Sequence, residues 1–212
     1  TSATATPTPV ATFGIITDVH YADAAPAGTR VYRDSLPKVL DATAAVSRAD
    51  ADFMIELGDF KDTDVARHCD TDPSPACVDL TVGFLRRIEA AFYGGFAGPH
   101  YHVLGNHDVD VLNQSVVLAN ERNAPGVDPG GAGYYSWSWP PAPAAHRPLR
   151  FVVLNGDYTA NGTAWKDLDR PFPGEAWDKA NVPAPQLAWL FLFLFFFLFI
   201  IFYNFIQNKC KK

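Results

Sequence analysis

Short apolar runs alternate with segments of helical periodicity along most of the chain. Runs with the length of buried strands occur at 12–17, 53–57, 101–104, 134–139 and 151–154. Between the first three runs, apolar residues recur at helical spacing, which predicts helices over 34–45 and 77–91. The order strand, helix, strand, helix, strand is typical of an α/β domain built from βαβ units.

The two ends of the chain differ from this pattern. Residues 1–11 are rich in Thr, Ala and Pro and predict a flexible leader ahead of a domain over 12–186. Residues 187–206 are apolar except for one Asn, and a helix of that length spans ~30 Å, the thickness of a bilayer core. The basic tail 207–212 then resembles a cytoplasmic flank.

Two interpretations of residues 187–206 stay open. They form a genuine single membrane helix, or they are the translation of a T-rich non-coding tract, since Phe, Leu and Ile share T-rich codons. The first interpretation places the protein in a membrane, and the second makes it soluble in a compartment that the sequence does not define.

Composition excludes several classes of protein. Hydrophobic residues make up 48 % of the chain, which excludes disorder throughout. The net charge of −6 leaves no basic surplus for binding nucleic acid. Three cysteines are too few for a disulfide scaffold. Cys69 and Cys77 form a local disulfide in an oxidising compartment or stay free thiols in the cytosol.

Three short polar motifs follow predicted strands directly. They are Asp18-Val19-His20, Gly58-Asp59 and Gly105-Asn106-His107-Asp108. In open α/β sheets the functional crevice lies at the carboxyl ends of the strands, so we expect the three motifs to converge.

The converging side chains suit a pair of divalent cations. Asp18, His20, Asp59 and Asn106 offer mixed oxygen and nitrogen ligands, which fit Mn, Fe or Zn. Two such ions can clamp a phosphate and activate an attacking water. His107 is then expected to stabilise the transition state or to protonate the leaving oxygen, with Asp108 orienting it.

The ordered set D-x-H, G-D and G-N-H-D resembles the calcineurin-like metallophosphoesterases. Further segments resemble the manganese-dependent ADP-ribose/CDP-alcohol diphosphatase group within it: 18–23, 28–36, 56–62, 101–108, 151–158 and 181–190. The resemblance implies the N-terminal portion of an α/β/β/α sandwich and a two-metal hydrolase of phosphoester or diphosphate bonds. It also implies a phosphorylated small molecule as substrate, such as ADP-ribose or CDP-choline.

The family pattern includes three further histidines that would complete both metal sites. The last histidine of these 212 residues is His146, which precedes the position of all three. The first metal would keep Asp18, His20 and Asp59, and the second only Asp59 and Asn106. We therefore expect impaired hydrolysis. The rival interpretation is a membrane-anchored, non-catalytic binding or scaffold protein.

A second group of residues lies near the predicted site in the resembling proteins. Arg30, Tyr32 and Arg33 are candidates for gripping a diphosphate and stacking on a base, or they form a solvated helix start. Asp62 either orients a ligand histidine or caps the following turn. The segment 100–102 contains His-Tyr-His, which we interpret as strand residues and not as a metal motif.

Overall fold

A three-stranded parallel sheet lies at the centre of the fold. The computed structural model describes residues 9–70, 74–127, 133–140, 148–158, 181–192 and 194. Strands β1 (Phe13–Ile16), β2 (Phe53–Glu56) and β3 (His100–His102) pair in the order β1-β2-β3. Phe13 is opposite Phe53, and Met54 is opposite His100. All three strands are therefore parallel, and the predicted βαβ organisation is confirmed.

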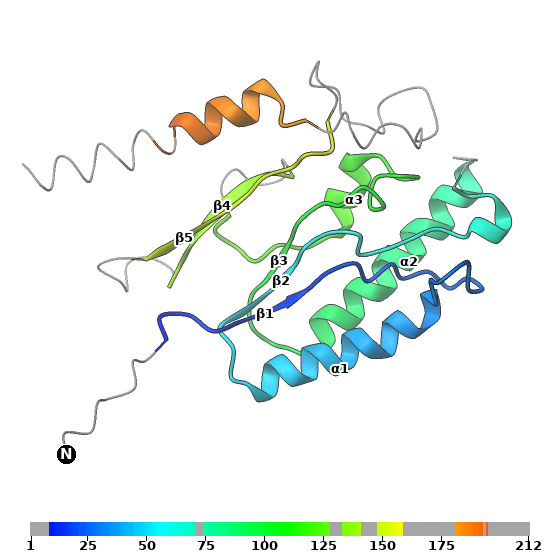
Figure 1. Cartoon of the computed structure of the whole chain (residues 1–212), viewed down its shortest axis with the longest axis horizontal. Helices are drawn as coiled ribbons and strands as arrows, with labels where there is room; N and C mark the ends of the chain where they lie inside the picture. The colour runs from blue at the N-terminus through cyan, green and yellow to red at the C-terminus, as the bar shows by residue number, and fades with distance from the viewer. Residues whose placement is uncertain are drawn as a thin grey trace, which may run out of the picture.

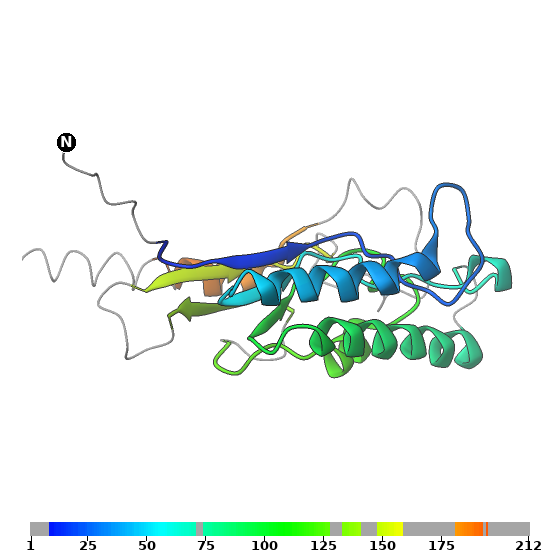
Figure 2. The same cartoon turned by 90° about the horizontal axis from the view of Figure 1, so that it is seen from below.

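The helices cover one face of this sheet (Figures 1 and 2). Helix α1 (Ser35–Arg48) connects β1 to β2, and α2 (Pro75–Gly94) connects β2 to β3. The first core cluster forms between them and includes Met54 from the sheet with Leu85 and Ile88 from α2, all fully buried. Both helices end three residues later than the predicted ends at 45 and 91. Helix α3 (Gln114–Asn120) and the 3-10 helices η1 (Tyr32–Asp34) and η2 (Val65–Arg67) were not predicted.

A two-stranded antiparallel sheet packs on the opposite face. It pairs β4 (Tyr135–Trp139) with β5 (Leu149–Val153). Because strand side chains alternate between faces, Phe53 and Ile55 point into this second core while Met54 points into the first. The rings of Tyr101 and Trp137 stack with centroids 3.8 Å apart across the two sheets. Aromatic pairs of this kind contribute about 0.5–1.5 kcal/mol beyond their buried area.

A helix over 184–192 lies on the side of β4 and β5 that faces away from β1, β2 and β3 (Figure 1). Trp189 of this helix meets the ring of Tyr134 at 5.2 Å. The layers of the described residues agree with the sandwich that the resemblance implied. Most of the predicted membrane helix 187–206 lies outside the described residues, as do 1–8 of the leader and the basic tail. Within the described part of the chain, no helix is both long and apolar enough to cross a bilayer.

Candidate metal centre

Three predicted ligands meet where β1 and β2 end. Nε2 of His20 lies 3.8 Å from Oδ1 of Asp18 and 3.6 Å from Oδ2 of Asp59. Ligand atoms of these residues all lie within 4.8 Å of one another. Two atoms that bind one ion at about 2.0–2.2 Å each lie at most about 4.4 Å apart, and both His20 distances are within that limit. The sheet topology therefore brings Asp18, His20 and Asp59 into the arrangement that the motifs predicted.

The backbone of these ligands is strained. Asp18, His20 and Asp59 have φ of 53°, 48° and 57°, in the left-handed region that non-glycine residues rarely occupy. Only two other described non-glycine residues, Asp50 and His68, share it. Such conformations cost on the order of 1–3 kcal/mol each and persist where the surrounding structure enforces them, often at functional sites.

The G-D and G-N motifs touch through their backbones. A Cβ on Gly58 would lie 2.8 Å from the Gly105 nitrogen, and a Cβ on Gly105 would lie 2.4 Å from Oδ1 of Asp59. Gly58 also has a φ of 98°. Both glycines are therefore required for the loops after β2 and β3 to approach each other.

Asp62 holds the side of His20 that faces away from the other ligands. Oδ2 of Asp62 lies 3.1 Å from Nδ1 of His20 and accepts a hydrogen bond from Arg30 at 2.9 Å. A carboxylate on Nδ1 leaves the Nε2 lone pair for a metal. Of the two roles left open by the sequence, this contact favours orienting the ligand histidine, and Asp62 also accepts the N–H of Thr63 at 2.7 Å.

His107 lies next to the ligand cluster. Its ring meets that of His20 at 4.9 Å, edge to face, and its backbone N–H donates to Oδ1 of Asp59 at 2.9 Å. Nη2 of Arg30 lies 3.1 Å from Nε2 of His107. Burial lowers the pKa of His107, but the hydrogen bond to Asp110 and the nearby negative charges outweigh it, so the pKa lies above its usual value.

Asp108 does not orient His107 as we expected. Its carboxylate is fully buried and accepts backbone N–H groups from four residues: Asp59, Phe60, Lys61 and Gly105, at 2.9–3.2 Å. It thus holds the two motif loops together. The carboxylate that contacts the His107 ring is Asp110, whose Oδ2 lies 3.2 Å from Nδ1. One turn of loop directs Asp108 inward and Asp110 toward the ring.

The fold separates the three predicted substrate-binding residues, Arg30, Tyr32 and Arg33. Arg30 reaches the cluster, as described above. Tyr32 is 3 % exposed and packs in the first core cluster, so it cannot stack on a base. Arg33 is turned toward solvent and pairs with Asp23, Nε to Oδ1, at 2.6 Å. Arg30 precedes η1, whereas Tyr32 and Arg33 lie within it and point into the core and to solvent, so only one of the three is brought to the site.

Asn106 lies between two residues that contact Asp59. Gly105 touches the Asp59 carboxylate region, and the N–H of His107 donates to it. The half-buried Asn106 is therefore held beside the carboxylate that it was predicted to share a metal with. Its amide oxygen remains a predicted ligand.

Three polar residues near the site were not predicted. Lys61 is fully buried and pairs with Asp110, Nζ to Oδ1, at 2.6 Å. Asp157 is 8 % exposed, and burial with the charges of Asp108 and Asp59 raises its pKa to about 7. Lys61 follows the G-D motif within Gly-Asp-Phe-Lys, and Asp110 follows the G-N-H-D motif within Asn-His-Asp-Val-Asp. This closeness in sequence was the one signal that could have identified them as site residues.

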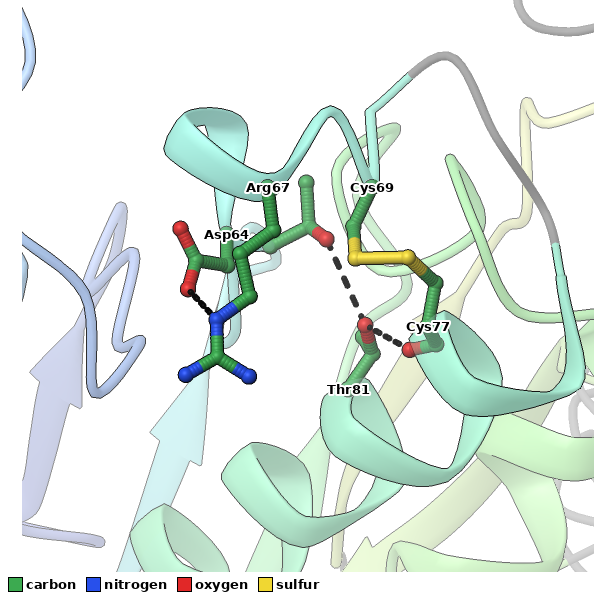
Figure 3. The surroundings of a disulfide bond; sticks show 6 residues. Asp64, Arg67, Cys69, Cys77 and Thr81 are labelled. Carbon is green, nitrogen blue, oxygen red and sulfur yellow. Dashed lines mark hydrogen bonds and ion pairs between the residues drawn. A yellow bond between two sulfur atoms is a disulfide. The ribbon is translucent and has the colours of Figure 1, made fainter.

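A disulfide between Cys69 and Cys77 closes the loop that follows Asp62 (Figure 3). Oγ1 of Thr81 donates to the Cys77 carbonyl at 2.8 Å and lies 3.3 Å from Oγ1 of Thr63. The bond therefore ties η2 to the start of α2 beside the residue that follows Asp62. Of the two states that the sequence left open, the structure contains the disulfide.

The donor set fits a hard or borderline divalent cation. It combines two carboxylates with one imidazole whose other nitrogen faces a carboxylate, as metal-ligating histidines commonly do. No thiolate takes part, which disfavours soft cations. The fold and this donor set together define a candidate divalent-cation site at the carboxyl ends of a parallel sheet.

Comparison with known proteins gives the family. The model of the family described as "Calcineurin-like phosphoesterase" matches residues 11–182, so the chain belongs to that family. The chain is similar to two proteins named manganese-dependent ADP-ribose/CDP-alcohol diphosphatase. The one from Arabidopsis thaliana is 31 % identical over 163 residues, covering 74 % of this chain and 45 % of that protein. The one from Danio rerio is 29 % identical over 160 residues, covering 69 % and 45 %.

A solved structure supports the same assignment. The chain superposes on a dimetal phosphatase from Danio rerio with a TM-score of 0.59 and 26 % identity, covering 86 % of this chain and 64 % of that one. The chain thus spans about half the length of the curated relatives that it matches. The resemblance drawn from the motifs is confirmed.

Proposed function

We propose that these residues form a metal-dependent hydrolase of phosphoester or diphosphate bonds. The observation that carries the proposal is the cluster of Asp18, His20 and Asp59, whose ligand atoms face one another on strained backbone. Strain of this kind is tolerated where a bound group needs the geometry. The names of the curated relatives support manganese as the cation.

The proposed substrate is a small molecule with a phosphoester or diphosphate, such as ADP-ribose or CDP-choline. The relatives' names and the position of Arg30 support this choice. A guanidinium beside His107 can bind a phosphate oxygen through two parallel N–H groups. The net charge of −6 argues against nucleic acid as the substrate.

Each side chain has a distinct task in the proposed reaction. Asp18, His20 and Asp59 would hold the first cation, and Asp59 with Asn106 would contribute to a second. When bound, the cations would polarise the phosphate and activate water. Arg30 would bind a phosphate oxygen, and His107, once protonated at Nε2, would give that proton to the leaving oxygen. Asp62 keeps His20 and Arg30 in place.

The second cation would be held weakly by these 212 residues, because only Asp59 and Asn106 are proposed for it. No histidine follows His146 in this sequence. We therefore expect binding of one Mn²⁺ with higher affinity than a second, and low turnover. Calorimetric titration of the purified chain with Mn²⁺ measures both affinities, and two equally tight sites would contradict this part of the proposal.

The main test compares two aspartate variants. Asp59→Asn removes the carboxylate shared by both proposed cation sites, whereas Asp41→Asn removes an exposed carboxylate on α1 with the same change of charge. The measurements are Mn²⁺ affinity and manganese-dependent hydrolysis of bis-p-nitrophenyl phosphate and ADP-ribose. Asp59→Asn should lower affinity and turnover by at least about 100-fold, since even indirect contacts to a metal contribute 10–100-fold.

Asp41→Asn shows whether losing one negative charge is enough to lower Mn²⁺ affinity or turnover. Asp41→Asn should match the wild-type chain in both measurements. Equal Mn²⁺ binding by the wild type and Asp59→Asn would refute the proposed cation site. Tight binding by the wild type without any hydrolysis would retain the cation site and refute the proposed activity.

A further inference from the structure

A chain of polar contacts connects Nδ1 of His107 to Asp110 and Lys61. Nδ1 of His107 lies 3.2 Å from Oδ2 of Asp110, and Oδ1 of Asp110 accepts a hydrogen bond from Lys61 at 2.6 Å. Nζ of Lys61 also donates to the backbone carbonyl of His107. The Lys61 side chain is 0 % exposed and that of Asp110 is 11 % exposed. The proposed reaction assigns no role to Lys61 or Asp110.

The donors and acceptors in this chain define one arrangement of protons on the neutral ring. A carboxylate only accepts hydrogen bonds and a guanidinium only donates them. Asp110 at Nδ1 therefore requires a proton on that nitrogen, and Arg30, 3.1 Å from Nε2, requires a lone pair there. The same contacts place Nε2 beside Arg30, the residue proposed to bind a phosphate oxygen.

Asp62 is the competing partner for Nδ1 of His107. Its Oδ1 lies 3.9 Å from that nitrogen, which is too long for a hydrogen bond. Both oxygens of Asp62 are already engaged, by the N–H of Thr63 and by His20 with Arg30. Geometry thus favours Asp110 as the hydrogen-bond partner of His107.

We propose that Asp110, held in place by Lys61, is the positioning residue that sets the tautomer and orientation of His107. Its consequence for catalysis rests on the proposed function. With Nδ1–H of His107 donating its hydrogen bond to Asp110, Nε2 is the nitrogen that takes up and releases a proton toward the substrate. Lys61 neutralises the buried carboxylate and fixes its second oxygen, so the carboxylate cannot rotate away.

The test replaces Asp110 by its amide. In Asp110→Asn, Lys61 still donates to the side-chain oxygen, so the NH₂ group is directed at Nδ1 of His107. An NH₂ donor requires a lone pair on Nδ1 and moves the proton to Nε2. The ¹⁵N shifts of the His107 ring, measured on the full chain without metal, should change from the Nδ1–H to the Nε2–H tautomer. His107→Gln identifies the signal.

A double variant supplies the rescue. In Lys61→Met with Asp110→Asn, the amide is free to rotate and to present its oxygen to Nδ1, and the Nδ1–H tautomer should return. In hydrolysis assays Asp110→Asn should lower kcat by about 100-fold with KM unchanged, and the double variant should recover at least part of that loss. Asp41→Asn again controls for the loss of one negative charge.

The outcomes separate this inference from the proposed function. If the wild-type chain hydrolyses no substrate, the proposed function fails, but the ring shifts still decide the role of Asp110. The Nδ1–H tautomer in Asp110→Asn, or unchanged kcat beside an active wild type, would overturn the inference. If Asp110→Asn does not fold, Lys61→Met with Asp110→Ala removes both charges, and a ring that keeps the Nδ1–H tautomer there would overturn it as well.

Discussion

Two clusters of histidine and carboxylate side chains lie close together in this fold and differ in their access to water. The open cluster consists of Asp18, His20, Asp59, Asp62 and His107, at the carboxyl ends of the strands. The buried cluster consists of Glu56, Glu89, His102 and Glu121, between β2, β3 and α2. Side chains of His20 and His107 are 15 % and 20 % exposed, whereas that of His102 is 1 % exposed.

The buried cluster stabilises charge internally. His102 lies 3.2 Å from Glu89 and 3.6 Å from Glu56, on opposite ring nitrogens. Burial lowers the pKa of His102, but the negative charge of Glu89 and the hydrogen bonds to Glu56 and Glu89 outweigh it and hold the pKa well above its usual value. The carboxylate oxygens of Glu56 and Glu89 lie at opposite ring nitrogens of His102, so they do not converge on one point. The same residue types therefore make a structural ion cluster here and a candidate cation site in the open cluster.

The buried cluster also supports the open one. Oε1 of Glu56 accepts the backbone N–H of Gly58 at 2.7 Å, and Gly58 directly precedes the ligand Asp59. Both clusters contain His with Asp or Glu. Accessibility and the direction of the ligand atoms therefore distinguish the candidate cation site from the structural cluster that supports it.

The largest expected contrast comes from the same substitution in each cluster. His102→Gln leaves the buried Glu56 and Glu89 without their positive partner and should lower the free energy of unfolding by about 3–5 kcal/mol. His20→Gln should change it by less than about 1 kcal/mol while weakening Mn²⁺ binding. Urea denaturation followed by circular dichroism, with Mn²⁺ titration, measures both. Equal destabilisation by the two variants would contradict the distinction.

A smaller effect is expected from the disulfide beside the open cluster. Cys69 and Cys77 are 8 residues apart, and replacing both by Ala should lower the free energy of unfolding by about 2.5 kcal/mol on the chain-entropy estimate. Loss of the bond releases η2 from the start of α2. Hydrogen exchange should therefore accelerate at 62–69 and stay unchanged in β3, and acceleration in β3 would show that the buried cluster shares the effect.

The smallest effect per pH unit is expected in the slope of the free energy of unfolding against pH. Burial raises the pKa of Glu56 to about 8, so its contribution to stability is full below about pH 4.5 and is lost as pH rises toward 8. The raised pKa of His102 acts in the same direction. Glu56→Gln should reduce the fall in the free energy of unfolding between pH 5 and 8, by at most about 1.4 kcal/mol per pH unit, as measured by urea denaturation at each pH. Asp41→Asn is the control, and an identical slope in Glu56→Gln and wild type would contradict the assignment.

Much of the fold was predictable because its determinants are local. The apolar runs located all three parallel strands. β1 and β2 end one residue before the predicted ends at 17 and 57, and β3 begins at 100 and ends at 102, earlier than the predicted 101–104. Helix α3 was missed because only one of its seven residues, Val117, is buried, which leaves no apolar periodicity to detect. The membrane helix stays a prediction, since most of 187–206 is outside the described residues.

The sequence by itself determined the family and the meeting of Asp18, His20 and Asp59. Parallel strands joined by helices must present their carboxyl ends at one edge, so ligands placed after those strands converge. Only the tertiary structure decided that Asp110 and not Asp108 contacts His107, that Tyr32 is buried, and that Cys69 and Cys77 are bonded. Those outcomes depend on side-chain direction and on exclusion of water, which are set by contacts between segments distant in the chain.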